Sequence, residues 1–140
     1  MADGLILLFE DDDGVAEFYR DCIPLSGYRV QHYWKPSDFL KQAADVQRLL
    51  DESLLVLTDG DMPGMHGLEL IRTLRTDHDY KKPAIYNSGR LAEKETAELE
   101  AQQVTLRDGS QIALVNRALV KPVGLRTLIS TIEAVTAPKP

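Results

Sequence analysis

Short apolar runs alternate with helical patterns along almost the whole chain, and this order restricts the possible folds more than any other feature. Five runs have the length and composition of strands: residues 5–9, 28–33, 54–58, 83–88 and 117–121. Between them, apolar residues recur every three or four positions, as in helices with one buried face. Strands joined by crossovers of this length pair in parallel, and right-handed crossovers place helices on both faces of the sheet. The sequence therefore predicts an α/β fold with a doubly wound, five-stranded parallel sheet.

The helices between these strands have recognisable boundaries. The first is expected to start with a cap at Asp13 and to end at Pro24 and Gly27. A second helix opens at residues 36–38 and is expected to continue unbroken to Leu50, and a third follows Gly67. Residues 91–102 predict a polar fourth helix, and residues 125–135 predict the last. We expect residues 1–136 to form one domain, followed by a tail or linker stub at 137–140.

One stretch, at about residues 104–116, does not follow the alternation of strands and helices. It alternates in polarity on both sides of Asp108-Gly109, a pair that favours a tight turn between antiparallel strands. We interpret it as a small inserted hairpin before the fifth strand. A continuation of the fourth helix is the alternative.

Composition excludes several functions. With a formal charge of −6, nucleic acid is not an obvious direct partner, because domains that bind it usually carry a net positive charge. A single cysteine, Cys22, rules out an internal disulfide framework. No apolar run approaches the length that crosses a membrane, so we expect no membrane insertion and a cytoplasmic protein.

Reactive side chains gather where the predicted strands end. Glu10 and Asp11 follow the first strand, Asp59 the third, Ser88 the fourth, and Lys121 the fifth. Because ligands bind outside the carboxyl ends of the strands in an open parallel sheet, we expect these five residues to form one site. A solvated helix start is the alternative for Glu10 and Asp11 taken alone, since acids favour helix N-termini.

Three neighbouring carboxylates repel one another unless a cation lies among them, and hard oxygen ligands suit Mg²⁺. Asp11 and Asp59 are the expected ligands, Glu10 holds a metal-bound water, and the backbone carbonyl of Asp61 adds a neutral oxygen. A carboxylate can also accept a phosphoryl group, and Asp59 on the central strand is best placed to do so. Lys121 would then offset the charge on that group.

The chain resembles the response-regulator receiver domain over nearly its full length. The matching segments are ILLFED (6–11), LLVLTDGDMPGMHGLEL (54–70), PAIYNSG (83–89) and ALVKP (118–122). The resemblance implies the (βα)5 flavodoxin-like three-layer sandwich of two-component signal transduction proteins. It also implies a cis peptide bond between Lys121 and Pro122.

The resemblance further implies roles for individual residues. Asp59 would be the phosphoacceptor that forms an aspartyl phosphate, Ser88 the switching hydroxyl, and Lys121 the lysine that pairs with the phosphate. Mg²⁺ would be held by Glu10, Asp11, Asp59 and the carbonyl of Asp61. The partners implied are a sensor histidine kinase or histidine phosphotransfer protein and an unknown downstream protein. Such a domain is not an enzyme beyond catalysing its own phosphorylation and dephosphorylation.

Two features depart from the family pattern. The family usually has Tyr or Phe three residues before the lysine, but this chain has Ala118, so the readout is expected to use another surface. Ser88 and Lys121 are also farther apart than is usual, and the excess lies in the expected insertion. In addition, Arg90 and Asp61 flank the proposed phosphate, and we expect a salt bridge between them to shield Asp59.

Two other kinds of function, a metal-dependent enzyme and a binding module, fit parts of the pattern. A haloacid-dehalogenase-type phosphatase also begins with an apolar strand followed by Asp-x-Asp, but that family expects Thr or Val at position 63, where this chain has Pro. The metal-binding acids of primase and topoisomerase domains are a weaker match. The second function is a receiver-like binding module that signals without phosphorylation, which the alanine at position 118 favours.

Overall fold

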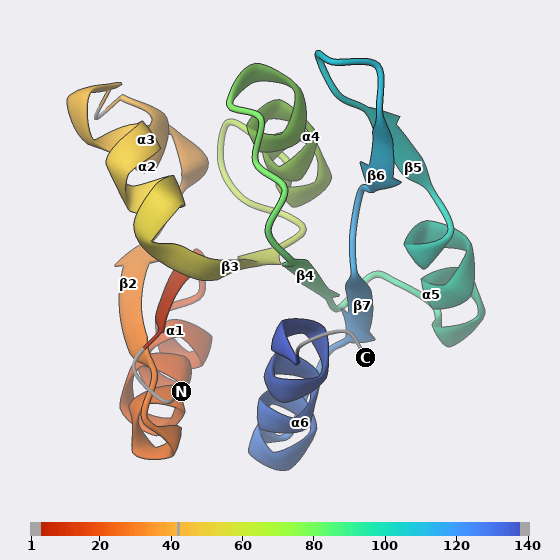
Figure 1. Ribbon diagram of the computed structural model, residues 1–140. Coiled ribbons are helices and arrows are strands. Elements are labelled where there is room, and N and C mark those ends of the chain that lie inside the picture. Colours follow the sequence, from red (N-terminus) through yellow and green to blue (C-terminus); the bar gives the residue numbers. More distant parts are fainter. Residues whose placement is uncertain (1–3, 42, 138–140) are drawn as a thin grey trace.

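The computed structural model describes residues 4–41 and 43–137, and its centre is a five-stranded parallel sheet. The strands lie in the order β2-β1-β3-β4-β7, the arrangement of a doubly wound fold (Figure 1). Their bounds are β1 (Leu5–Phe9), β2 (Arg29–Tyr33), β3 (Ser53–Asp59), β4 (Ala84–Ser88) and β7 (Arg117–Val120). The predicted sheet is therefore confirmed, with the most apolar strand, β3, at its centre.

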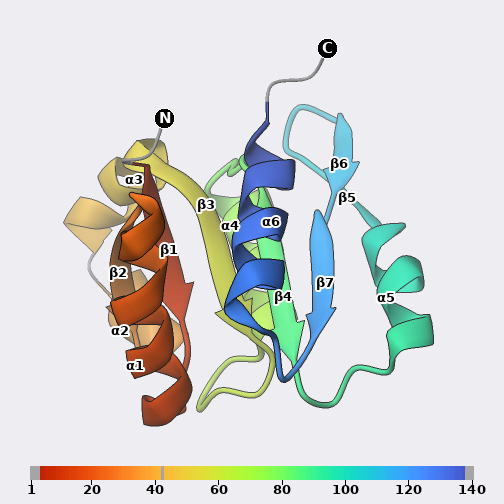
Figure 2. The same ribbon diagram turned by 90° about the horizontal axis from the view of Figure 1, so that it is seen from below.

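Helices cover both faces of the sheet and complete three layers. Figure 2 shows α1 (Asp13–Cys22) and α6 (Leu125–Thr136) on one face. On the other face lie α2 (Pro36–Leu40), α3 (Ala43–Glu52) and α4 (Gly67–Asp77), while α5 (Glu93–Glu100) flanks β7. A short 3₁₀ helix (Ile23–Ser26) follows α1 and ends at Gly27, which has a φ of 93°. No helix within the described residues is both long and apolar enough to cross a membrane.

The core is divided by the sheet, as the alternation of side chains along β1 illustrates. Leu5, Leu7 and Phe9 pack beneath α2, α3 and α4, whereas Ile6 and Leu8 pack against α1 and α6. All five side chains are buried, because a strand covered on both faces has no solvent side. This burial explains why the run is continuously apolar.

A two-stranded antiparallel hairpin lies between α5 and β7. It consists of β5 (Gln103–Thr105) and β6 (Gln111–Ala113), with Val104 opposite Ile112. Gly109 turns the chain with a φ of 88°, and the Asp108 carboxylate accepts hydrogen bonds from the backbone and hydroxyl of Ser110. The predicted hairpin is confirmed, and the continued helix is wrong.

Arg75 anchors this hairpin to α4. Its side chain is only 1% exposed, and the guanidinium donates to the carbonyls of Tyr80, Lys82 and Leu114 at 2.6–3.3 Å. It also donates to the side-chain oxygen of Asn116 at 3.1 Å. The buried guanidinium therefore links α4 to the end of the hairpin through hydrogen bonds to neutral oxygens.

Strand β7 forms one edge of the sheet, and α5 covers that edge. The carboxylate of Glu100 accepts a hydrogen bond from the backbone N–H of Ala118 at 2.8 Å. Ala118 is buried and pairs with Tyr86 of β4. The Glu100 side chain thus accepts a hydrogen bond that a neighbouring strand would otherwise accept.

Two predicted boundaries were wrong. The cap of α1 is Asp12, whose Oδ1 accepts the Val15 N–H at 3.0 Å, because the Asp13 carboxylate is bound by the Trp34 indole. The expected second helix is two helices, since α2 ends at Leu40 and α3 begins at Ala43. Periodicity misses this break because both pieces pack into the same apolar cluster. Of the expected tail, residues 138–140 lie outside the described part of the chain.

Candidate functional site

The carboxyl ends of three strands bring an ammonium group between two carboxylates. Lys121, which follows β7, places Nζ 2.8 Å from Oε1 of Glu10 and 3.0 Å from Oδ1 of Asp59. Glu10 is 1% exposed and Asp59 is 8% exposed, so this is a desolvated cluster rather than a surface ion pair. The peptide bond from Lys121 to Pro122 is cis, as the resemblance implied.

Asp11 extends the cluster to three carboxylates. One oxygen from each of Glu10, Asp11 and Asp59 lies within 4.8 Å of the others. Asp11 is exposed, so the group opens to solvent on one side. A set of hard anionic oxygens with room for water fits Mg²⁺ well. The predicted contribution of the Asp61 carbonyl to such a site stays a prediction.

Two acids of this cluster, Glu10 and Asp11, have raised pKa values. Burial raises the pKa of Glu10 to about 7, although the hydrogen bond and charge of Lys121 oppose that rise. Burial also raises the pKa of Asp11, helped by the neighbouring Asp59 carboxylate. For Lys121, burial acts to lower the pKa, but Glu10 and Asp59 outweigh it and raise the pKa above its usual value. Three acids facing one lysine are therefore short of positive charge.

Ser88 and the Arg90–Asp61 pair form the rim of the site. The Ser88 hydroxyl accepts the Arg90 backbone N–H at 3.1 Å, and Nε of Arg90 lies 2.8 Å from Oδ2 of Asp61. The predicted salt bridge is therefore present. Both its side chains are largely exposed, at 85% for Arg90 and 54% for Asp61. Within the described chain, no hydrogen bond joins the Ser88 hydroxyl to the Asp59 carboxylate.

A glycine allows α4 to begin against the acid-bearing strand. The Gly67 N–H donates to the carbonyl of Gly60 at 2.8 Å. A Cβ atom at position 67 would lie 1.9 Å from the carbonyl oxygen of Asp59, a distance that no side chain tolerates. The start of α4 is thus in direct contact with the backbone of the central acid.

Two residues at this edge were not predicted from the sequence. His66 caps α4 through Nδ1, which accepts the Leu68 N–H at 3.1 Å, and its Nε2 lies 3.4 Å from the Tyr86 hydroxyl. The available signal was position: Tyr86 precedes Ser88 by two residues on β4, so both side chains lie on the same face of the strand. Ala118, which was singled out, lies opposite Tyr86 in the register of β4 and β7.

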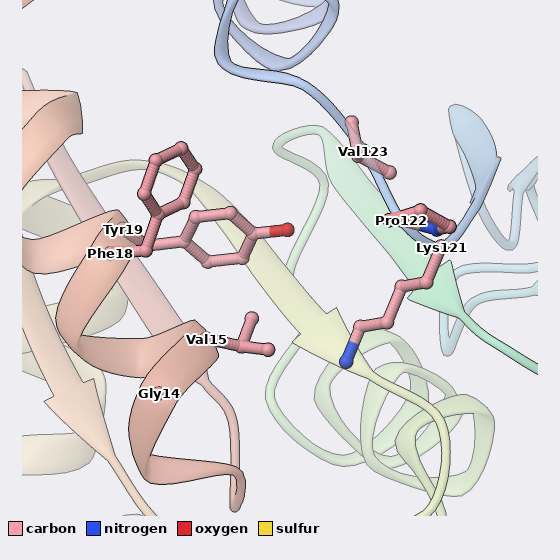
Figure 3. Close-up of a pocket in the computed structure, with 7 residues that line it drawn as sticks. All are labelled: Gly14, Val15, Phe18, Tyr19, Lys121, Pro122 and Val123. Atoms are coloured by element: carbon pink, nitrogen blue, oxygen red, sulfur yellow. The ribbon is translucent and has the colours of Figure 1, made fainter.

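An apolar hollow of about 530 Å³ opens beside Lys121. It is lined by Gly14, Val15, Phe18, Tyr19, Lys121, Pro122 and Val123. Figure 3 shows the Lys121 ammonium at its edge, with the rings of Phe18 and Tyr19 across from the Pro122 turn. Phe18 is 41% exposed, so its ring adds accessible apolar surface to the hollow.

The fold agrees with that of known proteins. Three solved structures similar to the chain are the CheY4 chemotaxis response regulator of Vibrio cholerae, the Francisella response regulator 1452 receiver domain, and FixJ-N. Their TM-scores are 0.71, 0.70 and 0.70, at 21%, 20% and 22% sequence identity. The matches cover 95%, 96% and 100% of this chain and 98%, 97% and 98% of those structures, respectively. No curated protein matches the sequence.

A sequence model of the response regulator receiver domain matches residues 6–133. That range contains all five strands of the sheet, apart from the first residue of β1, and every residue of the predicted site. The chain therefore belongs to the response regulator receiver domain family of two-component signalling.

Proposed function

We propose that this receiver domain accepts a phosphoryl group on Asp59 in a reaction that depends on Mg²⁺. The observation that carries the proposal is the position of the Lys121 ammonium, which binds the Asp59 and Glu10 carboxylates together at 3.0 and 2.8 Å. A nucleophilic carboxylate with a fixed cation beside it suits phosphoryl transfer, because that reaction is accelerated mainly by positioning and charge stabilisation.

Each residue has a defined part in the transfer. An oxygen of Asp59 forms a bond to phosphorus while the bond from phosphorus to the donor nitrogen breaks, and the electron pair of that bond leaves with the donor imidazole. Lys121 holds the acceptor carboxylate and offsets charge on the transferred group. The Ser88 hydroxyl donates a hydrogen bond to a phosphoryl oxygen. The domain thus catalyses its own phosphorylation and dephosphorylation and no other reaction.

The three clustered carboxylates would hold the metal, together with the backbone carbonyl of Asp61. When bound, Mg²⁺ supplies the positive charge that this cluster lacks and offsets charge on the phosphoryl oxygens. The raised pKa values of Glu10 and Asp11 support this assignment, because burial makes these carboxylates costly to ionise and the neighbouring Asp59 carboxylate adds to that cost, which a bound cation would offset.

We further propose that the protein phosphodonor docks on the hollow beside Lys121. The donor, a histidine kinase or histidine phosphotransfer protein, must bring its phosphohistidine to Asp59, and this apolar surface adjoins the site. Exposed aromatic side chains in such places contribute much of the binding energy of an interface. The pairing would take place in the cytoplasm.

Phe18→Ala tests this docking surface. We expect the rate of transfer from a protein donor to fall about tenfold or more, because one partly exposed aromatic side chain is worth about 1–3 kcal/mol at an interface. Phosphorylation by a small acyl phosphate should not change, since that donor makes no contact with a docking surface. Leu25→Ala is the matched control, because Leu25 is more exposed and lies outside the hollow. Equal losses with both donors would contradict the docking proposal.

Phosphorylation is proposed to bias an equilibrium between two forms of the domain, and so to alter the surface that a downstream protein binds. The readout surface is expected to differ from that of relatives with an aromatic residue at position 118. In this chain Ala118 lies opposite Tyr86 of the neighbouring strand, and both pack in the same apolar cluster.

The decisive experiment is intact mass spectrometry after incubation with Mg²⁺ and a small acyl phosphate. We expect one phosphoryl adduct on the wild-type protein, none without Mg²⁺, and none on Asp59→Asn. Asp61→Asn is the matched control, because it removes a neighbouring carboxylate that is not the acceptor, and it should retain the adduct. It also tests the phosphatase alternative, in which Asp61 would act as the acid.

Two outcomes would redirect the assignment. Mg²⁺ binding without an adduct, from either a small donor or a cognate kinase, would favour a binding module that signals without phosphorylation. Loss of the adduct in Asp61→Asn, but not in Asp59→Asn, would show that the acceptor has been assigned to the wrong residue.

A further inference from the structure

Tyr86 carries a buried hydroxyl group at the edge of the phosphoacceptor site. A Cβ atom at Gly60 would lie 2.4 Å from the Tyr86 hydroxyl oxygen and 3.1 Å from the Ser88 hydroxyl oxygen. The two hydroxyl groups therefore lie against the same glycine, one residue after Asp59. The Tyr86 ring is buried in an apolar cluster with Leu99 and Val104, which holds it in one position.

His66 determines which atoms near Tyr86 can donate. Its Nδ1 accepts the Leu68 N–H at the start of α4, so Nδ1 carries a lone pair rather than a proton. In a neutral imidazole the proton is then on Nε2, and that atom faces the Tyr86 hydroxyl at 3.4 Å. This assignment follows from the hydrogen-bond partners. Asp61 Oδ1 is farther from Nε2, at 3.8 Å.

Counting donors and acceptors then fixes the remaining protons. Tyr86 receives a proton donor from His66, so its own buried O–H must donate elsewhere. The acceptor that the geometry offers is Ser88, whose hydroxyl lies on the same face of β4 and against the same glycine, Gly60, as the Tyr86 hydroxyl. In agreement with this, burial raises the pKa of Tyr86, and a hydrogen bond to the Ser88 side chain opposes that rise. The Ser88 oxygen also accepts the Arg90 N–H at 3.1 Å. With Tyr86 and Arg90 both donating to its oxygen, Ser88 would keep its own proton free to donate.

We propose that Tyr86 is a positioning residue for Ser88 in the phosphoryl-transfer site. Hydrogen bonds run from His66 to Tyr86 and from Tyr86 to Ser88, fix the serine oxygen, and leave its proton to donate to the phosphoryl group on Asp59. The inference rests on the proposed function, because it assigns a role relative to that phosphoryl group. It adds two residues, His66 and Tyr86, that the sequence did not single out for the chemistry.

The first test compares Tyr86→Phe with the wild type in two backgrounds, Ser88 and Ser88→Ala. Phenylalanine keeps the ring and removes only the hydroxyl. With Ser88 present, we expect the rate of phosphorylation by a small acyl phosphate to fall about three- to tenfold, the usual worth of one hydrogen bond. With Ser88→Ala, the same change should have no further effect, because the residue that Tyr86 positions is gone.

Tyr80→Phe is the matched control. Tyr80 is equally buried, and its hydroxyl bonds to the Ser53 hydroxyl at 2.7 Å, but it lies outside the site. Its substitution should leave the phosphorylation rate unchanged. If Tyr86→Phe slowed the reaction equally in both backgrounds, the effect would come from packing and the positioning role would be refuted. An unchanged rate with Ser88 present would refute it as well.

The second test does not depend on phosphorylation. Nitrogen NMR of the His66 side chain at neutral pH should show a proton on Nε2 and none on Nδ1. A proton on Nδ1 would break the donor chain and overturn the inference, even if Asp59 is phosphorylated as proposed. A wild-type protein that forms no phosphoryl adduct would instead overturn the proposed function, and with it this role for Tyr86.

Discussion

Two cations, the partly buried Lys121 and the fully buried Arg75, lie in this domain in opposite kinds of surroundings. Lys121 contacts the carboxylates of Glu10 and Asp59, with the acidic side chain of Asp11 close by. The Arg75 guanidinium hydrogen-bonds only to neutral oxygens, those of three carbonyls and one amide, and to no carboxylate within the described residues. Burial lowers the pKa of Arg75 to about 10, whereas the pKa of Lys121 is raised by its acids.

The difference separates a reactive charge from a structural one. Every N–H group of the Arg75 guanidinium donates to an oxygen. This group therefore has no donor left for a ligand, and its role is to hold the chain in place. The Lys121 cluster has more negative than positive groups and opens to solvent at Asp11, so it gains stability from an added cation. A cluster whose negative charges exceed its positive charges marks a functional site, whereas a cation whose hydrogen-bond donors are all bound to neutral oxygens marks a structural joint.

Arg75→Met should give the largest change in stability. Removing the guanidinium leaves buried carbonyls of Tyr80, Lys82 and Leu114 without donors, and we expect the free energy of unfolding to fall by about 3–5 kcal/mol. Urea denaturation measures this. Arg72→Met, an exposed site on the same helix, should change it by less than about 0.5 kcal/mol. The folded fraction of Arg75→Met should still be phosphorylated, and loss of that activity would mean that the two sites are not separate.

Lys121→Met should reduce the phosphorylation rate much more than it reduces stability, which is the reverse of what we expect for Arg75→Met. The rate of phosphorylation by an acyl phosphate should fall about 10²–10³-fold, the usual cost of removing one charge-stabilising group from a transfer site. The free energy of unfolding should change by less than in Arg75→Met, because Glu10 can take up a proton when its partner is removed. Lys81→Met, at an exposed position, serves as the control. If Lys121→Met lost as much stability as Arg75→Met, the distinction between a reactive lysine and a structural arginine would be wrong.

Stability and Mg²⁺ affinity should both depend on pH through the acidic cluster around Lys121. The folded-state pKa of Glu10 is about 7, above its ordinary value of 4.5, so the folded protein holds this proton more strongly than the unfolded chain. Its contribution to stability is therefore full below about pH 4.5 and is lost as the pH rises towards 7. Mg²⁺ binds the ionised carboxylates, so its affinity should rise over the same range with release of protons.

Isothermal titration with Mg²⁺ at several pH values in buffers of different ionisation enthalpy would count those protons. Glu10→Gln should bind Mg²⁺ more weakly and with a flatter pH dependence. Proton release that is identical in the wild type and in Glu10→Gln would show that another group is responsible.

The smallest effect is expected at the exposed rim. Arg90→Glu breaks the ion pair with Asp61, and exposed pairs are worth only about 0.2–1 kcal/mol. Dephosphorylation of Asp59 should therefore become faster by a factor of about 1.5–5, because water reaches the site more easily. Arg126→Glu, on the exposed side of α6, provides the same charge change elsewhere. An unchanged rate of phosphate loss would show that the salt bridge does not shield Asp59.

The parallel sheet was predictable because each strand has a strong local signal. Residues 5–9 are apolar at every position, and the two-sided burial of β1 gives the reason. The hairpin was predictable from Asp108-Gly109, since only a few residue pairs favour so tight a turn. The acids and Lys121 followed from topology, because the ends of parallel strands meet at one edge.

Interactions that depend on three-dimensional contact were not predictable. Nothing in the sequence distinguishes Arg75 from Arg72, although one is buried and the other exposed, because they differ only in which side of α4 they occupy. The role of His66 depends on Tyr86, which is 20 residues away. The break between α2 and α3 left the apolar spacing undisturbed, so periodicity could not detect it.

The hydrogen bond from the Ala118 backbone to Glu100 has a consequence for the behaviour of the protein at high concentration. An unprotected edge strand invites a strand from another chain, which is a common first step in aggregation. Here a carboxylate from α5 occupies a donor of β7 and places negative charge along that edge. Growth of the sheet beyond β7 is thereby discouraged, so the copies of the chain can remain separate when they are crowded.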